Sequence, residues 1–537
     1  MHRIFLFFLI GFYALTASAV PAKRERCTLT LADGSTIEAT WMGDETMHFY
    51  LTDDGQCLQE DDNDIAHYAD GAVIQKRWKA KALKRQAARD KRTAARRRKS
   101  GKAIIGSKRG LVILIQFSDT PFYYTNADFR SLFNEEGYTD DVNIGSVHDY
   151  FLDASYGQFD FTFDVVGPVE LDNPLSHYGA NKSNGDDQLV AAMVAEAIDK
   201  ADEKVDFSQY DWDGDGEVEQ IFFIHAGYDE AQTRTRNDIW SHAWTLTEGA
   251  EEGDGNGPVE ADGVIIDSYA CSAELRGKTG IHLTGIGTAC HEFTHCFGLP
   301  DFYDTNGSNF GMNTWDIMDY GEYNGNGGTP TGFTSYERMH CGWLEPIELN
   351  DAMQVQEMPS LTSNPTAYII RNSGKEDEFF LFENRQKEGW DKHIGGHGML
   401  ILHVDYDSLA WAMNEANTVR SHQRMTIIPA DNFLSSWSLS GDTWPGTSGN
   451  TEFSDYSTPA AKFFNKNAEG DYLMHHSITE ITESPDGLIS FVFDEEALGL
   501  SSALSRKKGY IYDLQGRRQD KPSKGIYIQD GKKILIR

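Results

Sequence analysis

Cysteine is scarce in this sequence, with six in 537 residues, at positions 27, 57, 271, 290, 296 and 341. So few cysteines exclude a disulfide scaffold for a chain of this length, although export would permit individual bridges. Cys290 and Cys296 are not expected to pair, because on one helix they would lie about 9 Å apart along its axis. Stability must come from apolar cores, for which 40% hydrophobic and 12% aromatic residues are ample.

Long hydrophobic runs are absent after the N-terminus. The chain starts with a short basic segment, followed by an apolar run from Ile4 to Leu15 and the small residues Ala17-Ser18-Ala19. This pattern is typical of a cleaved secretory signal and is too short for a membrane span. We therefore expect a secreted or cell-surface protein without a transmembrane segment.

Basic residues are scarce outside one segment. Between Lys76 and Arg109 there are 16 Lys or Arg and a single acid, Asp90, which leaves 32 basic and 82 acidic residues for the rest of the chain. A body this acidic repels nucleic acid and anionic membranes, so no nucleic-acid partner is expected. We interpret the basic segment as a linker that an activating protease cuts. An uncut basic linker or exposed helix and a nucleic-acid-binding arm are the alternatives.

Strand, helix and turn signals divide the chain into segments. Buried-strand patterns such as "LVILIQFSD" and helical stretches such as "DDQLVAAMVAEAIDKA" alternate in the middle of the chain, whereas "EFFLFENRQ", "GMLILHVDYD" and "GLISFVFD" indicate strands later on. The prediction is a signal peptide at 1–19, a β-rich pro-segment at 20–75, a basic linker at 76–110, an α/β or α+β main domain at 111–344, an all-β, sandwich-like domain at 345–495, and a linker with a short β tail at 496–537. The tail resembles C-terminal sorting signals of some Gram-negative exported proteins, and a last β-hairpin is the alternative.

The stretch "HEFTHCFGLPDFYD" places two histidines, His291 and His295, four residues apart. Apolar residues recur at helical spacing around them, so both imidazoles should project from one side of a half-buried helix. Gly298 is a natural place for that helix to end, and Pro300 prevents its continuation. The chain is therefore expected to turn and bring Asp301 back toward the histidines.

Two imidazoles and a carboxylate form a three-ligand zinc site with one open position, as expected of catalytic zinc. Glu292 directly follows the first histidine and is the candidate general base that takes a proton from the attacking water. Asp301 is preferred over Asp304 as the third ligand, with Asp304 in a supporting role. The alternative is a pair of hydrogen-bonded helix histidines beside a solvated glutamate.

Met318 and Tyr320 follow this motif within "NTWDIMDYG". The stretch resembles the methionine turn beneath the zinc of metzincin-type peptidases, where a tyrosine two positions on assists the tetrahedral intermediate. A core methionine among aromatic residues is the alternative.

Together with "SVHDYFLDASYGQFDF", "DWDGDGEVEQIFFIHAG", "IWSHAW" and "FENRQKEGWDKHIGGHGMLILHVD", these motifs resemble the secreted bacterial immune-inhibitor-A family of zinc metallopeptidases. The resemblance runs from about residue 111 to 495, and the preceding segment is similar to the pro-region of that family. It implies a zincin/metzincin-like α+β catalytic domain with an appended all-β domain. It also implies an extracellular endopeptidase made as a zymogen, with Asp301 where most metzincins use histidine.

Two further groups of residues suggest metal sites. Asp211, Asp213, Asp215 and Glu219 in "DWDGDGEVE" suit calcium by their alternate spacing, but the twelfth loop position of an EF-hand is Phe222, and a polar turn is the alternative. His403, Asp405 and Asp431 are either a second metal site or hydrogen-bonded strand residues, and the second interpretation is favoured.

The sequence therefore predicts a zinc endopeptidase that hydrolyses extracellular proteins or peptides, with Ca²⁺ as a candidate second cofactor. The rival hypothesis is a carbohydrate- or matrix-binding surface protein with an inactive protease-like domain, in which aromatic residues such as Trp437 and Trp444 stack on sugars. The presence of Glu292 favours the enzyme, because an inactive domain has no need of the base.

Overall fold

The computed structural model describes residue 22, the ranges 25–44, 47–61, 63–74, 103–181, 187–305 and 309–494, and the backbone of four C-terminal strands. The predicted signal peptide and residues 76–102 of the basic linker lie outside the described residues, so both interpretations remain predictions. None of the helices in the described ranges combines the length and the hydropathy that crossing a bilayer requires. All six cysteines are free thiols.

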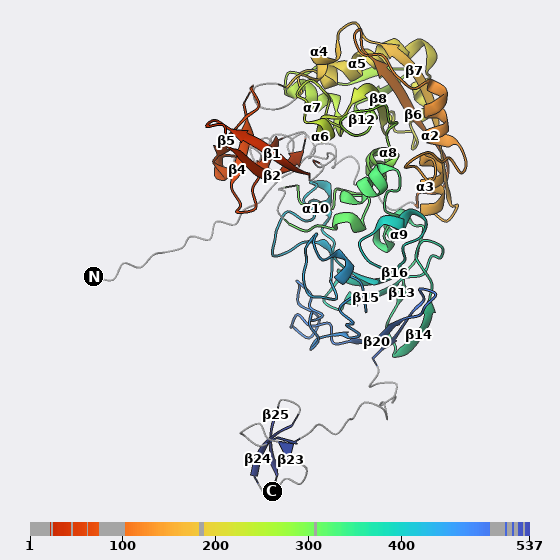
Figure 1. Ribbon diagram of the computed structural model, residues 1–537. Helices are drawn as coiled ribbons and strands as arrows, with labels where there is room; N and C mark the ends of the chain where they lie inside the picture. The colour runs from red at the N-terminus through yellow and green to blue at the C-terminus, as the bar shows by residue number, and fades with distance from the viewer. Residues whose placement is uncertain are drawn as a thin grey trace.

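The N-terminal segment is a small closed barrel, shown in red in Figure 1. Its strands are β1 (Arg26–Leu31), β2 (Thr36–Asp44), β3 (Met47–Leu51), β4 (Cys57–Glu60) and β5 (Ile65–Ala69). Neighbouring strands are antiparallel, and the parallel pairing of β1 with β5 closes the barrel. The predicted β-rich character of this segment is confirmed.

A five-stranded sheet of order β7-β6-β8-β12-β9 forms the centre of the next segment. Its strands are β6 (Gly106–Gln116), β7 (Phe159–Glu170), β8 (Ile221–Tyr228), β9 (His242–Thr245) and β12 (Ser268–Leu275), and the short pair β10 (Val259–Ala261) and β11 (Val264–Ile266) lies outside this sheet. The first four strands of the order are parallel, and β9 is the antiparallel edge strand. The mixture of helices and parallel strands is compatible with the predicted α+β class.

Helices cover both faces of this sheet because both faces of its central strands are apolar. Val112 and Leu114 of β6 pack in one core with α2 (Asn126–Asn134), α3 (Val147–Ala154) and α8 (Gly287–Thr294). Leu111 and Ile113 face the opposite side, in a second core with α5 (Val190–Ala201). Shorter helical segments are α4 (Leu175–Gly179), α6 (Glu230–Thr233), α7 (Leu246–Glu251), α9 (Ser335–Cys341), η1 (Asp202–Lys204), η2 (Phe207–Tyr210), η3 (His295–Phe297), η4 (Asn313–Trp315) and η5 (Tyr320–Gly327).

The first strand of this segment, β6, begins at Gly106 and pairs with β7 from there, ahead of the predicted domain start at about residue 111. The polar residues at its start are accommodated at the sheet surface, where Lys108 donates to the carbonyl of Trp212 at 2.7 Å and Arg109 pairs with Asp164. Ile104 is also held, since its amide donates to the carbonyl of Cys341 at 2.9 Å. A charged stretch at the beginning of a strand resembles a linker in sequence, which explains the difference.

The segment from 345 to 494 contains two further sheets, of order β13-β15-β16-β17-β18 and β14-β21-β20-β19. The first contains β13 (Ile347–Glu348), β15 (Tyr368–Asn372), β16 (Lys375–Arg385), β17 (Gly398–Asp405) and β18 (Met425–Ile427). The second contains β14 (Met353–Met358), β19 (Phe453–Ser454), β20 (Ser477–Glu483) and β21 (Ile489–Phe493). Residues of both sheets share one core, so they pack face to face, and we call residues 345–494 the β module.

The first sheet of the β module is buried on both faces, and every residue of β17 is buried. Met399 and Ile401 lie in the core between the two sheets, whereas Leu400, Leu402 and Val404 lie in the core that contains α8. Figure 1 shows α8 between the sheet of β6, β8 and β12 and that of β15 and β16. The β module and the preceding segment therefore share a hydrophobic core.

The C-terminal strands β22 (Ile511–Tyr512), β23 (Arg518–Gln519), β24 (Gly525–Gln529) and β25 (Lys532–Ile536) form a separate four-stranded sheet of order β23-β22-β24-β25. The tail is thus larger than the single hairpin considered from the sequence. Its interpretation as a sorting signal remains a prediction.

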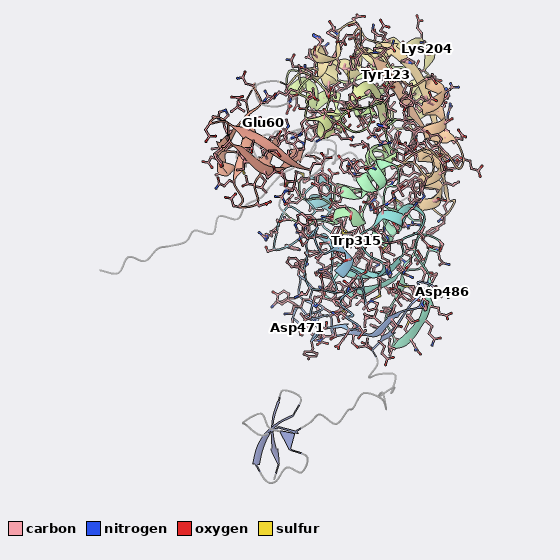
Figure 2. All side chains as sticks on the ribbon, viewed as in Figure 1. Glu60, Tyr123, Lys204, Trp315, Asp471 and Asp486 are labelled. Carbon is pink, nitrogen blue, oxygen red and sulfur yellow. The ribbon has the colours of Figure 1, made fainter. Side chains whose placement is uncertain are left out.

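A buried arginine joins β16 to the segment that follows α8. Arg385 is fully buried and donates to both carboxylate oxygens of Asp391 at 2.7 and 2.6 Å, and to Glu383 at 2.9 Å. It also donates to the carbonyl of Trp315 at 3.3 Å. Figure 2 labels Trp315 near the junction between the β module and the preceding segment. Burial opposes its charge, but Asp391 and Glu383 outweigh burial and raise the pKa of Arg385 above its ordinary value.

We predict that Arg385→Ala lowers the free energy of unfolding by about 3–5 kcal/mol, because two buried carboxylates lose their counter-charge. Arg371→Ala is the matched control, since Arg371 pairs with Glu348 at 2.8 Å on the surface and should contribute less than about 1 kcal/mol. Urea unfolding of the two variants measures both values. Equal effects of the two substitutions would contradict the structural role of Arg385.

Candidate metal centre

Helix α8 is fixed to the main sheet by its apolar face. Phe293 packs against three phenylalanines of β7 and β8, with ring centroids 5.1–5.4 Å apart: Phe161, Phe163 and Phe222. Ile286, Ala289, Cys290 and Phe297, which the sequence assigned to the same face, are all buried in this core. The predicted helix is confirmed, with its last turn in the tighter form of η3, and the opposite side of α8 carries the histidines.

The imidazoles of His291 and His295 lie side by side, with ring centroids 5.0 Å apart. Nδ1 of His291 lies 2.8 Å from the carbonyl oxygen of Ile317, and Nδ1 of His295 lies 2.9 Å from that of Leu299. A carbonyl oxygen only accepts, so each Nδ1 carries the proton and donates. The lone pair of each Nε2 is thereby left available for a metal ion.

Asp301 returns to these histidines as predicted from the turn at Gly298. Gly298 has a φ of 85°, a left-handed conformation that favours glycine, and it ends η3. Asp301 Oδ1 consequently lies 3.1 Å from Nε2 of His291 and 3.4 Å from Nε2 of His295. Burial opposes ionisation of Asp301, but His295 and His291 outweigh burial and lower the pKa of its carboxyl.

Glu292 lies beside the same group with a fully buried side chain, and its Oε2 is 3.9 Å from Nε2 of His295. Burial raises the pKa of the Glu292 carboxyl above its ordinary value. His291, Glu292 and His295 together offer three ligand atoms within 4.8 Å of one another and could hold a metal ion. The Asp301 oxygen is closer to both imidazoles than that of Glu292 is to His295, which favours Asp301 over Glu292 as the third ligand.

Several atoms of this group are buried without a hydrogen-bond partner among the described residues: Nε2 of His291, both carboxylate oxygens of Glu292 and Oδ1 of Asp301. An unsatisfied buried polar atom costs about 1–3 kcal/mol, so a cluster of such atoms requires an explanation. Two imidazole nitrogens and a carboxylate oxygen are the donor set that zinc takes in proteins. The residues present therefore fit a bound zinc ion.

The segment of Met318 is hydrogen-bonded to this group and to the loop of Asp301. Ile317 supplies the carbonyl that accepts from His291, and the carbonyl of Met318 accepts from the amide of Phe302 at 2.7 Å. Met318 itself is fully buried. The segment therefore contacts one histidine and the residue after Asp301, which is consistent with the predicted turn. Tyr320 opens η5 and is half-buried, and its predicted catalytic role remains a prediction.

Asp304 lies further along the same loop. Its Oδ2 accepts from the amide of Asn309 at 2.8 Å and thereby holds the loop. This contact agrees with the supporting role predicted for Asp304.

Two residues near the group were missed by the sequence analysis. Asn414, in the β module, contacts Asp301 through two hydrogen bonds. Glu322 is fully buried, and burial raises the pKa of its carboxyl to about 8. Asn414 is 113 residues from Asp301 in sequence, and no local pattern indicates this pairing.

The predicted calcium residues are partly brought together. Ligand atoms of Asp211, Asp213 and Glu219 lie within 4.8 Å of one another. The Asp215 carboxylate accepts from the amide of Glu217 at 3.0 Å, and the Asp211 carboxylate accepts from the amides of Gly214 and Gly216 at 2.8 and 2.9 Å. These hydrogen bonds are those of a polar turn, so the calcium site remains a prediction.

The second metal site considered in the β module is not formed. His403 pairs with Glu378 at 3.0 Å, and Asp405 accepts from Lys375, His422 and Arg424. Asp431 accepts from the amide of Phe433 at 2.9 Å. These residues are hydrogen-bonded, as the favoured alternative predicted. The sugar-stacking role of Trp444 is also wrong, because Trp444 is fully buried and donates to the carbonyl of Ile428, whereas Trp437 is 90% exposed.

Comparison with curated proteins gives relatives of low identity. The chain is 26% identical over 272 residues to "Immune inhibitor A" of Bacillus thuringiensis subsp. alesti, covering 42% of this chain and 38% of the relative. It is also 26% identical over 287 residues to "Pre-pro-metalloprotease PrtV" of Vibrio cholerae serotype O1, covering 44% of this chain and 30% of the relative. The match thus spans less than two fifths of either relative.

Residues 107–343 match the model of the family described as "Immune inhibitor A peptidase M6, catalytic domain". This range contains the whole candidate metal centre except Asn414, and it begins one residue after the start of β6. The resemblance of residues 107–343 to the catalytic domain of the immune inhibitor A family of metallopeptidases is therefore confirmed.

Proposed function

We propose that the chain is a secreted zinc-dependent endopeptidase, made as a zymogen, that hydrolyses extracellular proteins or peptides. The observation that carries the proposal is the convergence of Nε2 of His291, Nε2 of His295 and Oδ1 of Asp301 in a buried group. The family match supports a peptidase, and the apolar N-terminal run supports secretion.

His291, His295 and Asp301 would hold the zinc ion, with the fourth position open to substrate and water. A zinc ion so bound supplies Lewis-acid chemistry, by activating water and polarising the scissile carbonyl. Carbonyl acceptors at Ile317 and Leu299 fix both imidazoles in the Nδ1-protonated form. The helix, the glycine turn and the parallel sheet above them support a zincin-like fold for this domain.

Glu292 acts as the general base in this proposal. Its carboxylate takes a proton from the attacking water and delivers it to the leaving amine nitrogen as the C–N bond breaks. Burial raises the pKa of Glu292 and so favours the protonated form that this second step requires. Tyr320 is proposed to donate a hydrogen bond to the oxyanion of the tetrahedral intermediate.

The barrel β1–β5 supports synthesis as a zymogen, because it packs against the catalytic segment. Trp41 and His48 of the barrel lie 6.0 and 5.5 Å from Trp240, measured between ring centroids. Arg236 donates to the carbonyls of Glu60 and Asp61 at 3.0 and 2.5 Å. We propose that a protease cutting in the basic segment separates this barrel from the enzyme.

The rival function is a sugar- or matrix-binding protein with an inactive protease-like domain. One of the two tryptophans proposed to stack on sugars, Trp444, is buried and cannot contact a ligand. Casein hydrolysis by the purified chain, before and after limited trypsin treatment, separates the two functions. The enzyme hypothesis requires activity that a zinc chelator abolishes and added zinc restores.

Glu292→Gln is expected to bind zinc normally, since the two histidines and Asp301 remain, yet to lose about 10²–10⁴-fold in casein hydrolysis. Zinc content by atomic absorption and the rate of hydrolysis are measured on the same preparation. Activity near the wild-type level in this variant would show that Glu292 is not the base.

Asp301→Ala is expected to lose zinc and activity together, because a ligand is removed. Asp304→Ala serves as the matched control from the same loop and should weaken zinc binding by about 10–100-fold at most, since Asp304 only holds the loop. Metal analysis of the two purified variants tests the assignment. Normal zinc in Asp301→Ala together with none in Asp304→Ala would reverse it.

N-terminal sequencing of the active enzyme is expected to give a start between Arg77 and Ala103. The sequence alone predicts a cut at about Arg98–Arg109 and a mature start close to "GLVILIQF". Cutting after Lys108 or Arg109 would, however, remove part of β6 and its pairing with β7, so these two sites should be spared. An active enzyme that begins at Gly110, or that retains the barrel, would contradict the proposed processing.

A further inference from the structure

The carboxylate of Asp301 is held by a side chain from the β module. Asn414 Nδ2 donates to Asp301 Oδ2 at 2.5 Å, and Asn414 Oδ1 accepts from the amide of Asp301 at 2.6 Å. Both residues are buried. Asn414 lies 71 residues beyond the end of the family match.

These two hydrogen bonds fix the orientation of both groups. The Asp301 amide can only donate and its carboxylate accepts, so the Asn414 amide has a single orientation that satisfies both. With Oδ2 bound by Asn414, Oδ1 is the oxygen that faces Nε2 of His291 and His295. The arrangement leaves one oxygen of Asp301 directed at the proposed metal position and keeps the other away from it.

Asn414 is itself fixed by the helix that precedes it. It follows α10 (Ser408–Ala412) in a left-handed conformation with a φ of 56°, which asparagine adopts more readily than most residues. The backbone amide of Asn414 donates to the carbonyl of Trp411 at 3.2 Å. The centroid of the Trp411 ring lies 5.9 Å from that of Phe302. Asn414 is therefore held by α10, and α10 itself packs against Phe302, the residue that follows Asp301.

Other polar side chains of the β module hold the rest of the same loop. Asn417 Nδ2 donates to the carbonyl of Phe302 at 2.7 Å, and the carbonyl of Asn417 accepts from Asn309 Nδ2 at 2.8 Å. Gln423 Oε1 accepts from the amide of Gly311 at 2.7 Å, and the Thr426 hydroxyl donates to the carbonyl of Gly311 at 2.9 Å. Within the described part of the loop, Asp301, Phe302, Asn309 and Gly311 thus each contact the β module.

We propose that Asn414 is a positioning residue that orients Asp301 as a metal ligand, so that the β module completes the metal centre of the catalytic segment. This inference rests on the proposed function, in which Asp301 binds zinc. Without Asn414 the Asp301 carboxylate can rotate. Part of the free energy of metal binding is then spent on fixing its orientation, so the metal affinity falls. Hydrogen-bond partners of this kind change metal affinity by about 10–100-fold.

Asn414→Gly is the test variant, because glycine removes the amide yet adopts the same backbone conformation without strain. Zinc affinity of the full chain is measured by competition with a chromogenic chelator and is expected to fall by about 10–100-fold. Asn384→Ala is the matched control. Asn384 is a buried β-module asparagine that donates to the carbonyls of Met358 and Gly487 at 2.9 and 2.8 Å, and its removal should leave zinc affinity unchanged.

A double-mutant cycle distinguishes positioning from a general loss of structure. In the Asp301→Ala background, the two histidines leave only a residual zinc affinity, which is measured at higher zinc concentration. If Asn414 acts through Asp301, Asn414→Gly should not lower this residual affinity further. Wild-type affinity in Asn414→Gly, the same loss in both backgrounds, or an equal loss in Asn384→Ala would overturn the inference while leaving the zinc site in place. Wild-type affinity in Asp301→Ala would instead overturn the ligand assignment, and the inference with it.

Discussion

Everything around the candidate metal centre depends on one unfavourable arrangement, in which two imidazole nitrogens and a carboxylate oxygen are held together in a buried place. Nε2 of His291 and Oδ1 of Asp301 have no hydrogen-bond partner among the residues that the structure describes. Their burial is costly unless a cation binds there, so the surrounding structure must hold them. Edge-to-face and tilted phenylalanine contacts fix α8, backbone carbonyls fix both imidazoles, and a glycine turn returns the chain to them.

The second requirement is that the loop after the turn be held from outside the catalytic segment. The first sheet of the β module meets this requirement because both of its faces are apolar, one toward the second sheet and one toward α8. Arg385 connects the same sheet to Trp315, close to the segment that is hydrogen-bonded to His291. The two regions are successive in sequence, but they share a core and jointly build the site.

Much of the site could be predicted from sequence because its determinants are local. The four-residue spacing of His291 and His295, the apolar residues around them and Gly298 together specify a helix, the side that carries the histidines and its end. The strands of the β module were likewise indicated by apolar runs such as that of β17. The start of β6 was not, because Ser107, Lys108 and Arg109 find polar partners only in the folded sheet.

The remaining features depend on contacts between distant residues. Asn414 carries no signal in "WAMNEANTV", since only the packing of α10 on Phe302 brings it to Asp301. The burial of Trp444 has the same origin, because its neighbours belong to the core between two sheets. A sequence pattern describes which residues share a face of one element, but it does not specify which elements meet.

The most direct test of the account is the zinc X-ray absorption spectrum of the full chain loaded with one equivalent of zinc. Coordination by His291, His295 and Asp301 predicts a first shell of nitrogen and oxygen at about 2.0–2.2 Å, with the scattering signature of two imidazoles. A sulfur shell at about 2.3 Å, or a spectrum with fewer than two imidazoles, would contradict it.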